Sequence, residues 1–508
     1  MISRLALRNF LDRPWRTAFL LGGYAVGVGV MIVLLSIGEA LLTQASDERL
    51  VGGGEITVLP EGIDVEVLKT GGLGGMFFSI PNARFLHLQL LASRRLDPVV
   101  RAVAPQIEDQ LLYLRPLGRP EVRRGARDRE IPVRASGEIP SRTRLVGAAP
   151  ELAAGAWEDD EGDRRWVAPT RAELYADIDR FHLPSDDLAI PESWAEWHYF
   201  NVLSEDGTRW AFISLVVGGD IPDGDWGGRV LVALHGIGVP ERRFIADVPA
   251  EEVSLSTVHA DLDLGSSSVR LLPDGRYEVR AHAREERTGD SVHVELTFDP
   301  AEGAYFPGTA MGDESRGFVS GYVVPALRAS ASGNVCVERA CRTYESAMGY
   351  HDHNWGVWAG VTWEWGIARA GQYSVLYGQV QPPDSIAATA PLFVYVTDSL
   401  GFLAIFRPTS IAYEDARTIT VGGAPVRVPA RALLADARGG DTLRLELEIE
   451  DAVGTDTRRP LIERGSQADA RGLPRPFFIQ MKGRVRLSGR IDGQALTAEG
   501  AGFFETYR

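Results

Sequence analysis

From Trp194 to the end of the chain, apolar and polar residues alternate with a period of two. In the clearest run, every second residue from Leu443 to Ile449 is aliphatic and the residues between them are charged. This period predicts β-strands with one buried and one solvated face. Asp-Gly pairs at 206–207, 274–275 and 492–493 mark hairpin turns between such strands. The pattern predicts two antiparallel barrels or sandwiches.

A different pattern opens the chain. No charged residue occurs between Thr17 and Gly38, a stretch long enough to cross a hydrocarbon core of about 30 Å. Arginines precede this stretch and Glu39 follows it, so the positive-inside rule puts the N-terminus in the cytoplasm. A cleaved signal peptide is the alternative, but its apolar region is usually shorter. We expect a retained single-pass anchor in the cell inner membrane, with the bulk of the chain extracytoplasmic.

Composition narrows the class of protein. The net charge of −16 over 508 residues argues against nucleic acid as a partner, because phosphate recognition needs a basic surface. The two cysteines, Cys336 and Cys341, become opposed cross-strand neighbours if Glu338 and Arg339 form a two-residue turn. Outside the cytoplasm such a pair can oxidise. Two sulfurs are too few for a structural zinc site.

Imidazole, carboxylate and indole side chains are concentrated in the segment Tyr350–Gly356. In an extended strand, His351, His353 and Trp355 share one face and Asp352 lies on the other. The alternative interpretation is an aromatic core whose polar tips are hydrogen-bonded.

The next run, Thr362–Gly366, repeats the pattern. Trp363 and Trp365 share a face, and Glu364 opposes them. This mixture of indoles and a carboxylate is more than a simple surface strand needs.

A metal could be chelated by His351 and His353, because an H-x-H strand presents both rings on one side. A third ligand would come from Glu364, Glu196 or His198. Trp355 makes the same face aromatic rather than rich in ligands, so we expect no metal and no cofactor.

These residues resemble a known family. Tyr350–Gly356 together with Trp363–Gly366 resembles the signature of the hydroxyneurosporene synthase (carotenoid 1,2-hydratase) family and its lipocalin-like, AttH-type relatives. Ser193–Phe200 resembles the family's entry to its first barrel, with His198 replacing a usual Trp, and Gly500–Glu505 resembles its last strand. The resemblance implies two lipocalin-like barrels in tandem with an apolar pocket near their junction.

The expected fold class is therefore mainly β. Two tandem lipocalin-like antiparallel barrels follow one transmembrane helix and a mixed α/β N-terminal region. We expect the cytoplasmic N-terminus and helix at 1–45 and the mixed region at 46–185. The first barrel is expected at 186–325, and the second, carrying the His-Asp-His-Asn-Trp-Gly motif, at 326–508.

The N-terminal residues resemble a second, unrelated family. Leu5–Asn9, followed by Arg16-Thr17 and a Gly-rich span, is similar to the opening helix of FtsX/MacB-type ABC transporter permeases. Such permeases have three further membrane helices, which this chain lacks. The resemblance implies an accessory role beside an ABC transporter permease as a partner.

The resemblance to hydratases implies an acid-catalysed reaction. Adding water to an isolated alkene needs a proton donor, rings that stabilise a carbocation, and a placed water. The candidate catalytic residues are Asp352, His353, Trp355 and Tyr377. The candidate substrate-binding residues are His351, Trp363, Glu364, Trp365, Glu196, Trp197 and His198. We expect His353, Trp355, Trp365 and Tyr377 to line one buried apolar pocket in the second barrel, with Asp352 or Glu364 near it.

One position departs from the hydratases. They place an acid two residues after a tyrosine in the strand that follows Trp-Glu-Trp-Gly, whereas this chain has Tyr377-Gly378-Gln379. Gln379 cannot protonate an alkene, which weakens the prediction of hydration itself.

The function predicted is that of a membrane-anchored lipocalin-like protein acting on a hydrophobic isoprenoid, carotenoid or other lipid ligand. Hydration, isomerisation and cyclisation are the candidate reactions, as in a hydro-lyase. The alternative is a non-catalytic lipid-binding component of an ABC-type exporter. A structural envelope protein is the third hypothesis.

The topology can be tested directly. A reporter that is active only in the cytoplasm, fused after Arg508, should be silent, because one membrane span with a cytoplasmic N-terminus puts residue 508 outside. An active reporter there would refute the predicted orientation. A fusion of the same reporter before Met1 is the positive control.

Overall fold

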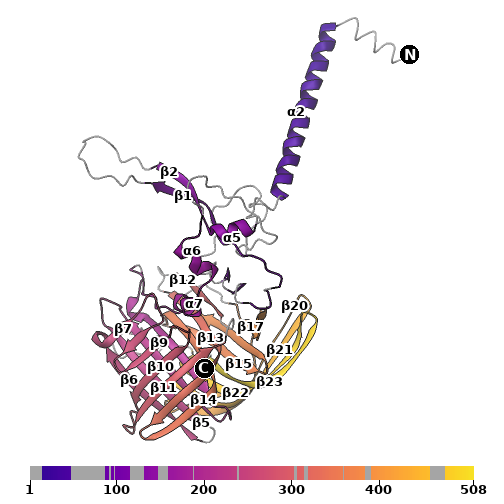
Figure 1. Cartoon of the computed structure of the whole chain (residues 1–508). Helices are drawn as coiled ribbons and strands as arrows, with labels where there is room; N and C mark the ends of the chain where they lie inside the picture. The colour runs from indigo at the N-terminus through magenta and orange to yellow at the C-terminus, as the bar shows by residue number, and fades with distance from the viewer. Residues whose placement is uncertain are drawn as a thin grey trace, which may run out of the picture. The chain divides into compact units, whose positions relative to one another are not determined.

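The computed structural model describes residues 14–46, 86–87, 89–90, 93–96, 98–114, 131–146, 158–186, 188–236, 239–301, 306–313, 318–358, 360–383, 391–457 and 475–508 (Figure 1). The chain divides into two compact units. The first contains Met1–Ser79 and Ala102–Asp160, and the second contains Ile80–Arg101 and Glu161–Arg508.

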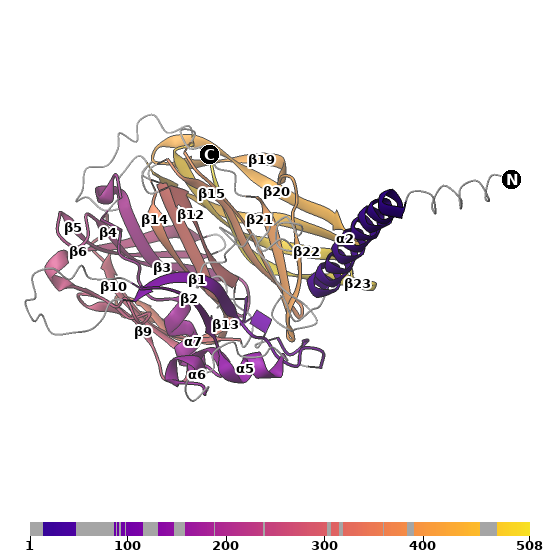
Figure 2. The ribbon, with the colours of Figure 1, turned by 90° about the horizontal axis from the view of Figure 1, so that it is seen from above.

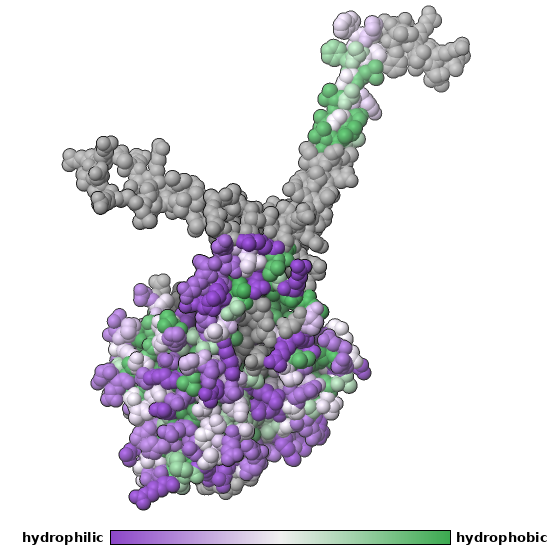
Figure 3. All heavy atoms as spheres, in the orientation of Figure 1, coloured by the Kyte–Doolittle hydropathy of each residue, from purple (hydrophilic) through white to green (hydrophobic). Residues whose placement is uncertain are grey.

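The first unit holds one long helix and a small hairpin. Helix α2 covers Pro14–Ser46, and its Pro14–Val33 segment is long and apolar enough to cross a membrane, a test that a signal sequence also passes. Large hydrophobic side chains along this segment are exposed (Figure 3). Strands β1 (Gln106–Leu114) and β2 (Ile131–Glu138) pair antiparallel, and the short helix α5 covers Pro140–Leu145.

In the second unit, two short helices precede the large sheets, α6 (Glu161–Val167) and α7 (Arg171–Ile178). Helix α7 starts at a capping box in which Thr170 and Glu173 satisfy each other's backbone N–H groups. The predicted mixed region 46–185 is thus divided, because α6 and α7 belong to the compact unit that contains the β-sheets. The glycine-rich segments at 51–54 and 71–75 lie outside the described residues.

The first large sheet closes on itself. Eight of its strands form a ring, in the order β3-β4-β5-β6-β10-β11-β13-β14, because β14 pairs with β3 and β10 pairs with both β6 and β11. Four short strands, β7, β8, β9 and β12, extend this sheet beyond the ring. The strands are β3 (Trp194–Leu203), β4 (Arg209–Gly219), β5 (Trp226–Gly236), β6 (Val239–Pro249), β7 (Val253–Leu255), β8 (Leu262–Leu264), β9 (Ser267–Leu271), β10 (Tyr277–Arg284), β11 (Ser291–Pro300), β12 (Phe306–Asp313), β13 (Phe318–Val337) and β14 (Ala340–Val357). Two 3₁₀ turns, η2 (Pro191–Ser193) and η3 (Ala250–Glu252), precede β3 and β7.

The second sheet has nine antiparallel strands in the order β18-β17-β16-β15-β23-β22-β21-β20-β19. Its strands β15 and β19 to β23 are labelled in Figure 2. Its two end strands, β18 and β19, are not paired with each other, so this barrel is open at one seam. The strands are β15 (Thr362–Ala370), β16 (Tyr373–Gln381), β17 (Phe393–Asp398), β18 (Gly401–Phe406), β19 (Ala412–Val421), β20 (Ala424–Arg438), β21 (Asp441–Asp456), β22 (Phe477–Ile491) and β23 (Gln494–Tyr507). The predicted fold class, mainly β with two lipocalin-like antiparallel barrels, is confirmed.

The predicted division between the barrels is not where the sheets divide. Residues 325 and 326 lie inside β13, and β13 and β14 both belong to the first sheet. The His-Asp-His-Asn-Trp-Gly motif on β14 therefore lies in the first barrel and not in the second. The first ring closes only when β14 returns to pair with β3, more than a hundred residues earlier, and no local pattern reveals such a long-range pairing.

The cysteine prediction is confirmed. Glu338 and Arg339 form the two-residue turn between β13 and β14, and Glu338 has the positive φ of 53° that such a turn needs. Cys336 and Cys341 are cross-strand partners and form a disulfide.

Among the described residues of the second unit, three hydrophobic clusters are large. One lies inside the first barrel and one inside the second. The third contains residues of β3, β4, β13 and β14 together with residues of β15, β16, β17 and β23, so it lies between the two sheets. Strands β3 and β15, and β14 from Gly349 to its end, thus have two buried faces, where the alternation predicted one buried and one wet face.

Close packing inside the first sheet produces a testable constraint. A Cβ added at Gly321 would lie 2.2 Å from the indole of Trp355, its cross-strand partner. Gly321→Ala should therefore destabilise the fold by about 1–3 kcal/mol, as overpacking does. The double variant Gly321→Ala/Trp355→Leu should lose less than the sum of the two single changes, measured by chemical unfolding. Additive losses would show that the two positions do not touch.

Candidate functional site

Strand β14 carries chemistry on both of its faces. His351 and His353 face the interior of the first barrel, whereas Tyr350 and Asp352 face the second sheet. All four side chains are buried. The alternation predicted from the sequence is correct, but each face belongs to a different cluster.

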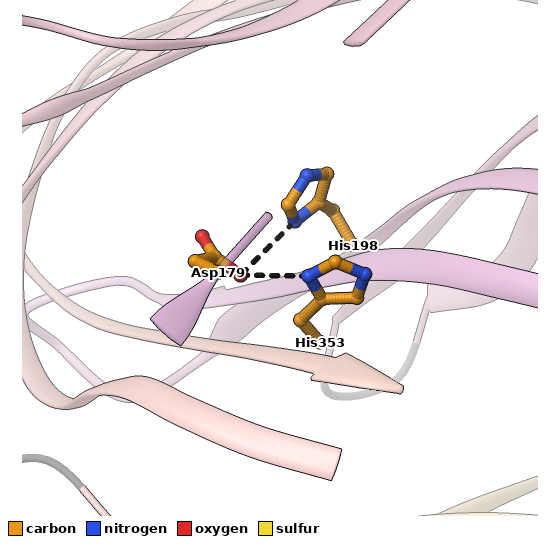
Figure 4. Close-up of side chains that lie close together, drawn as sticks. All are labelled: Asp179, His198 and His353. Atoms are coloured by element: carbon orange, nitrogen blue, oxygen red, sulfur yellow. Dashed lines mark hydrogen bonds and ion pairs between the residues drawn. The ribbon is translucent and has the colours of Figure 1, made fainter. Parts of the chain in front are cut away.

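The interior cluster is centred on Asp179, which directly follows helix α7. Its Oδ2 lies 2.9 Å from His351 Nε2, and its Oδ1 lies 2.8 Å from His353 Nδ1. His198 on β3 also points toward this carboxylate, with Nδ1 3.6 Å from Oδ1 (Figure 4). Asp179, His198, His351 and His353 are each 0% exposed.

A second carboxylate flanks this cluster. Glu196 Oε1 lies 2.9 Å from His353 Nε2 and 3.0 Å from His182 Nδ1. The backbone N–H of His182 also donates to Glu196. The His182 ring stacks on Trp355 at 3.8 Å, which places both aromatic rings beside His353.

The charges of the interior cluster are strongly coupled. Burial by itself lowers the pKa of His353, but hydrogen bonds to Asp179 and Glu196 outweigh burial and raise it to about 9. Burial raises the pKa of Asp179, yet the surrounding histidines hold it well below its usual value. Burial lowers the pKa of His198 well below its usual value. Two sets of these residues could hold a metal ion by the proximity of their ligand atoms: Asp179, His198 and His353, and His182, Glu196 and His353.

The cluster between the sheets has two buried carboxyl groups. Asp352 Oδ2 accepts a hydrogen bond from the Tyr350 hydroxyl at 2.7 Å, and that hydroxyl accepts one from Trp365 Nε1 at 2.9 Å. Asn354 donates to the other oxygen of Asp352. The second carboxyl group belongs to Glu505 on β23, whose Oε2 accepts from Trp363 Nε1 at 2.9 Å.

Burial raises the pKa of both carboxyl groups. Burial is the main cause for Glu505, and hydrogen bonds from Trp363, Tyr199 and Gln480 only partly offset it. For Asp352, burial and the nearby Glu505 charge raise the pKa well above its usual value. Carboxyl groups in this setting favour the protonated, neutral form more than they would in water.

Three half-buried indoles pack together, and one of them, Trp363, contacts Glu505. Trp197, Trp358 and Trp363 form the group that we call the tryptophan rim, with ring centroids 4.6 Å, 5.5 Å and 6.4 Å apart. Trp363 also contacts Phe478 and Tyr507 at 5.2 Å and 4.8 Å. The buried acid is therefore bordered by aromatic surface that is partly open to solvent.

The remaining predicted site residues lie inside the second barrel. Glu364 accepts hydrogen bonds from Thr506 at 2.9 Å and from Tyr413, and burial raises its pKa. Glu364 is also the cross-strand partner of Gln379. Tyr377 belongs to the core of this barrel.

The structure thus divides the predicted single pocket. The expectation that His353, Trp355, Trp365 and Tyr377 line one pocket in the second barrel is wrong. Strand β14, with His353 and Trp355, belongs to the first sheet, whereas Trp365 and Tyr377 lie on opposite faces of the second sheet. Inside the first barrel lie His351, His353, Trp355, Glu196 and His198. Between the sheets lie Asp352, Trp197, Trp363 and Trp365. Inside the second barrel lie Glu364 and Tyr377.

Several residues of these clusters were not predicted as site residues, among them Asp179, His182, Trp358 and Glu505. Asp179 and His182 lie in the segment after α7, where no local pattern marks them. Glu505 lies within Gly500–Glu505, which was singled out for its resemblance alone. Because Glu505 is two residues from Phe503 and two from Tyr507, the spacing predicts that the three side chains share one face of the strand.

Comparison with known proteins gives only distant similarities. No family model and no curated protein matches the chain. Among solved structures, the chain is similar to an AttH-type protein from Nitrosomonas europaea, with 17% identity, a TM-score of 0.40, and coverage of 65% of this chain and 97% of that one. It is also similar to kievitone hydratase from Nectria haematococca, with 13% identity, a TM-score of 0.40, and coverage of 65% and 94%. CghA gives 14% identity, a TM-score of 0.39, and coverage of 65% and 96%. Similarities this distant identify no ligand or reaction for this chain.

The raised pKa of Glu505 predicts a pH dependence. A carboxyl group whose pKa is higher in the folded than in the unfolded state binds more protons when folded, so stability falls as pH rises from about 4.5 through the folded pKa. Each unit of upward shift corresponds to about 1.4 kcal/mol. Glu505→Gln should therefore raise the melting temperature at pH 8 more than at pH 4.

The matched control is Glu499→Gln, which changes an exposed glutamate on the same strand. It should shift the melting temperature little at either pH. A Glu505→Gln variant with the same pH profile as the wild type would show that Glu505 has an ordinary pKa.

Proposed function

We propose that this protein acts on a hydrophobic, isoprenoid-type ligand by acid catalysis between its two sheets, with Glu505 as the proton donor. One observation carries the proposal. A buried carboxyl group is held by Trp363 Nε1 at 2.9 Å and borders a half-exposed group of three indoles.

The surroundings of Glu505 favour an apolar ligand. The tryptophan rim and the neighbouring Phe478 and Tyr507 offer aromatic faces and few charged groups. Such faces bind apolar chains by burial and stabilise a developing carbocation by about 1–2 kcal/mol per ring when water is excluded. The described α2 helix, as a membrane span, would keep the protein near a source of lipid.

The chemistry follows from a neutral acid beside these rings. The Glu505 carboxyl group gives its proton to the less substituted carbon of an alkene, whose π electrons form the new C–H bond. The cation forms on the more substituted carbon, against the indole faces. Water then adds its oxygen there and returns a proton to the Glu505 carboxylate, or the cation gives a proton from a neighbouring carbon to that carboxylate and becomes an isomeric alkene. Gln379, which cannot donate a proton, takes no part in these steps.

The other polar residues between the sheets have a positioning role. Asp352, Tyr350 and Trp365 form a hydrogen-bonded chain that fixes the Tyr350 hydroxyl next to the aromatic core. Hydrogen bonds of this kind can orient a water molecule toward a cation. The role in an ABC-type exporter stays a prediction, and a protein that binds the ligand without altering it would support that role.

Deuterium exchange tests the proposed chemistry. The detergent-solubilised protein is incubated in D₂O with a panel of isoprenoid alkenes, and products are examined by mass spectrometry. The wild type should incorporate deuterium from solvent, because the proton of Glu505 exchanges with solvent before each transfer. Glu505→Gln should reduce incorporation by at least about 100-fold, as loss of a general acid does.

Binding is measured separately by quenching of tryptophan fluorescence. Glu505→Gln should retain the ligand, whereas Trp363→Leu should weaken its binding, and Glu499→Gln should change neither property. Deuterium incorporation that is unaffected in Glu505→Gln would refute the assigned role of Glu505. Binding without incorporation by the wild type would refute catalysis and favour a carrier.

A further inference from the structure

The interior cluster of the first barrel takes no part in the proposed reaction, yet it has an unusual arrangement of hydrogen-bonding atoms. The outward-facing ring nitrogen of each of its three histidines lies against an oxygen. His198 Nε2 is 2.9 Å from the carbonyl of Ala260, and His351 Nδ1 is 3.1 Å from the carbonyl of Tyr199. His353 Nε2 is 2.9 Å from Glu196 Oε1.

These contacts assign the protons of the neutral rings. Carbonyl and carboxylate oxygens only accept hydrogen bonds, so each outward nitrogen carries the N–H. The inward nitrogen of a neutral imidazole is then a lone pair. All three inward nitrogens point at Asp179, which is also an acceptor. Lone pairs that face one another in a fully buried site need protons or a cation between them.

The lack of hydrogen-bond donors for the inward nitrogens is clearest at His198. Its Nδ1 is buried and has no hydrogen-bond partner among the described residues, although Asp179 Oδ1 lies 3.6 Å away.

The charges of the interior cluster also favour a bound cation. Asp179 and Glu196 bring two carboxylates into the barrel interior, and every ion pair that they form with described residues is to a histidine. A divalent cation would neutralise the two carboxylates, and buried carboxylates require such a partner.

The distances fit a small metal ion. Ligand atoms bound tetrahedrally to zinc at about 2.0–2.1 Å lie about 3.3 Å from one another. The Asp179 Oδ1 distances of 2.8 Å to His353 Nδ1 and 3.6 Å to His198 Nδ1 lie on either side of that value. The ligand atoms of Asp179, His198 and His353 all lie within 4.8 Å of one another.

The surrounding contacts also match a metal centre. Histidine ligands of metals usually donate their other N–H to a carboxylate or a backbone carbonyl. Glu196 accepts the hydrogen bond from His353 Nε2, and the Ala260 carbonyl accepts the one from His198 Nε2. His351 holds the second oxygen of Asp179 at 2.9 Å and so orients the carboxylate.

We propose that the first barrel binds a divalent transition-metal ion of the zinc type through Asp179, His198 Nδ1 and His353 Nδ1. No metal was expected from the sequence, because Trp355 shares the face of His351 and His353 and no local pattern marks Asp179. The site is structural, since all three ligands are fully buried. The ion joins the segment after α7 to β3 and β14.

Metal binding is tested on the tag-free full chain in detergent, after dialysis against a chelator and then against metal-free buffer. Titration with Zn²⁺, followed by elemental analysis, should give about one equivalent per chain and a higher melting temperature. Co²⁺ should bind with the visible absorption of a tetrahedral site. His198→Ala and Asp179→Asn should each reduce bound metal to below about 0.1 equivalent.

His235→Gln is the matched control, because His235 is also a buried histidine but stacks on Trp210, away from Asp179. It should bind metal like the wild type. Glu196→Gln keeps the three ligands and should weaken binding by about 10–100-fold, so it remains informative if a ligand variant does not fold.

A wild-type chain that takes up neither Zn²⁺ nor Co²⁺ would overturn the proposal and show that protons alone satisfy the histidines. Metal uptake that persists in both His198→Ala and Asp179→Asn would overturn it too. The proposal is independent of the acid catalysis assigned to Glu505, because Glu505→Gln should bind Zn²⁺ normally.

Discussion

The structure depends on the return of β14 to pair with β3, which closes the first barrel. This pairing connects the end of the barrel sequence to its beginning and brings the two histidines of β14 beside His198. The same two strands also form the surface on which the second sheet packs. Because both faces of each strand are then buried, every polar side chain on them must find a partner inside the protein.

The two faces meet this requirement in different ways. Inside the first barrel, acceptors outnumber the protons that neutral imidazoles can supply, and we infer a cation. Between the sheets, hydroxyl, indole and amide groups donate to Asp352 and Glu505, and burial shifts both carboxyl groups toward the neutral form. One cluster therefore favours charge and the other favours its absence, although the two are separated by the thickness of a single strand.

This arrangement gives the two clusters separate tasks. The interior cluster links three segments that are far apart in the sequence, so it contributes to the geometry of β3 and β14. The aromatic and acidic residues that we assign to the ligand lie on the outer face of those strands and on β15 and β23. A change at the metal ligands is expected to alter the position of Asp352 through the backbone of β14, without direct contact with the ligand.

The sequence by itself determined the local features of this protein. The period of two fixed which residues share a face of β14 and β15, and the two-residue spacing between Val337 and Ala340 fixed the hairpin that opposes the cysteines. The tertiary structure alone decided which strands are neighbours, and hence that Tyr377 and Trp355 lie in different barrels. It also brought Asp179 to His198 and His353. Contacts between residues far apart in a chain depend on which strands pair when a barrel closes. The alternation within one strand does not determine that pairing.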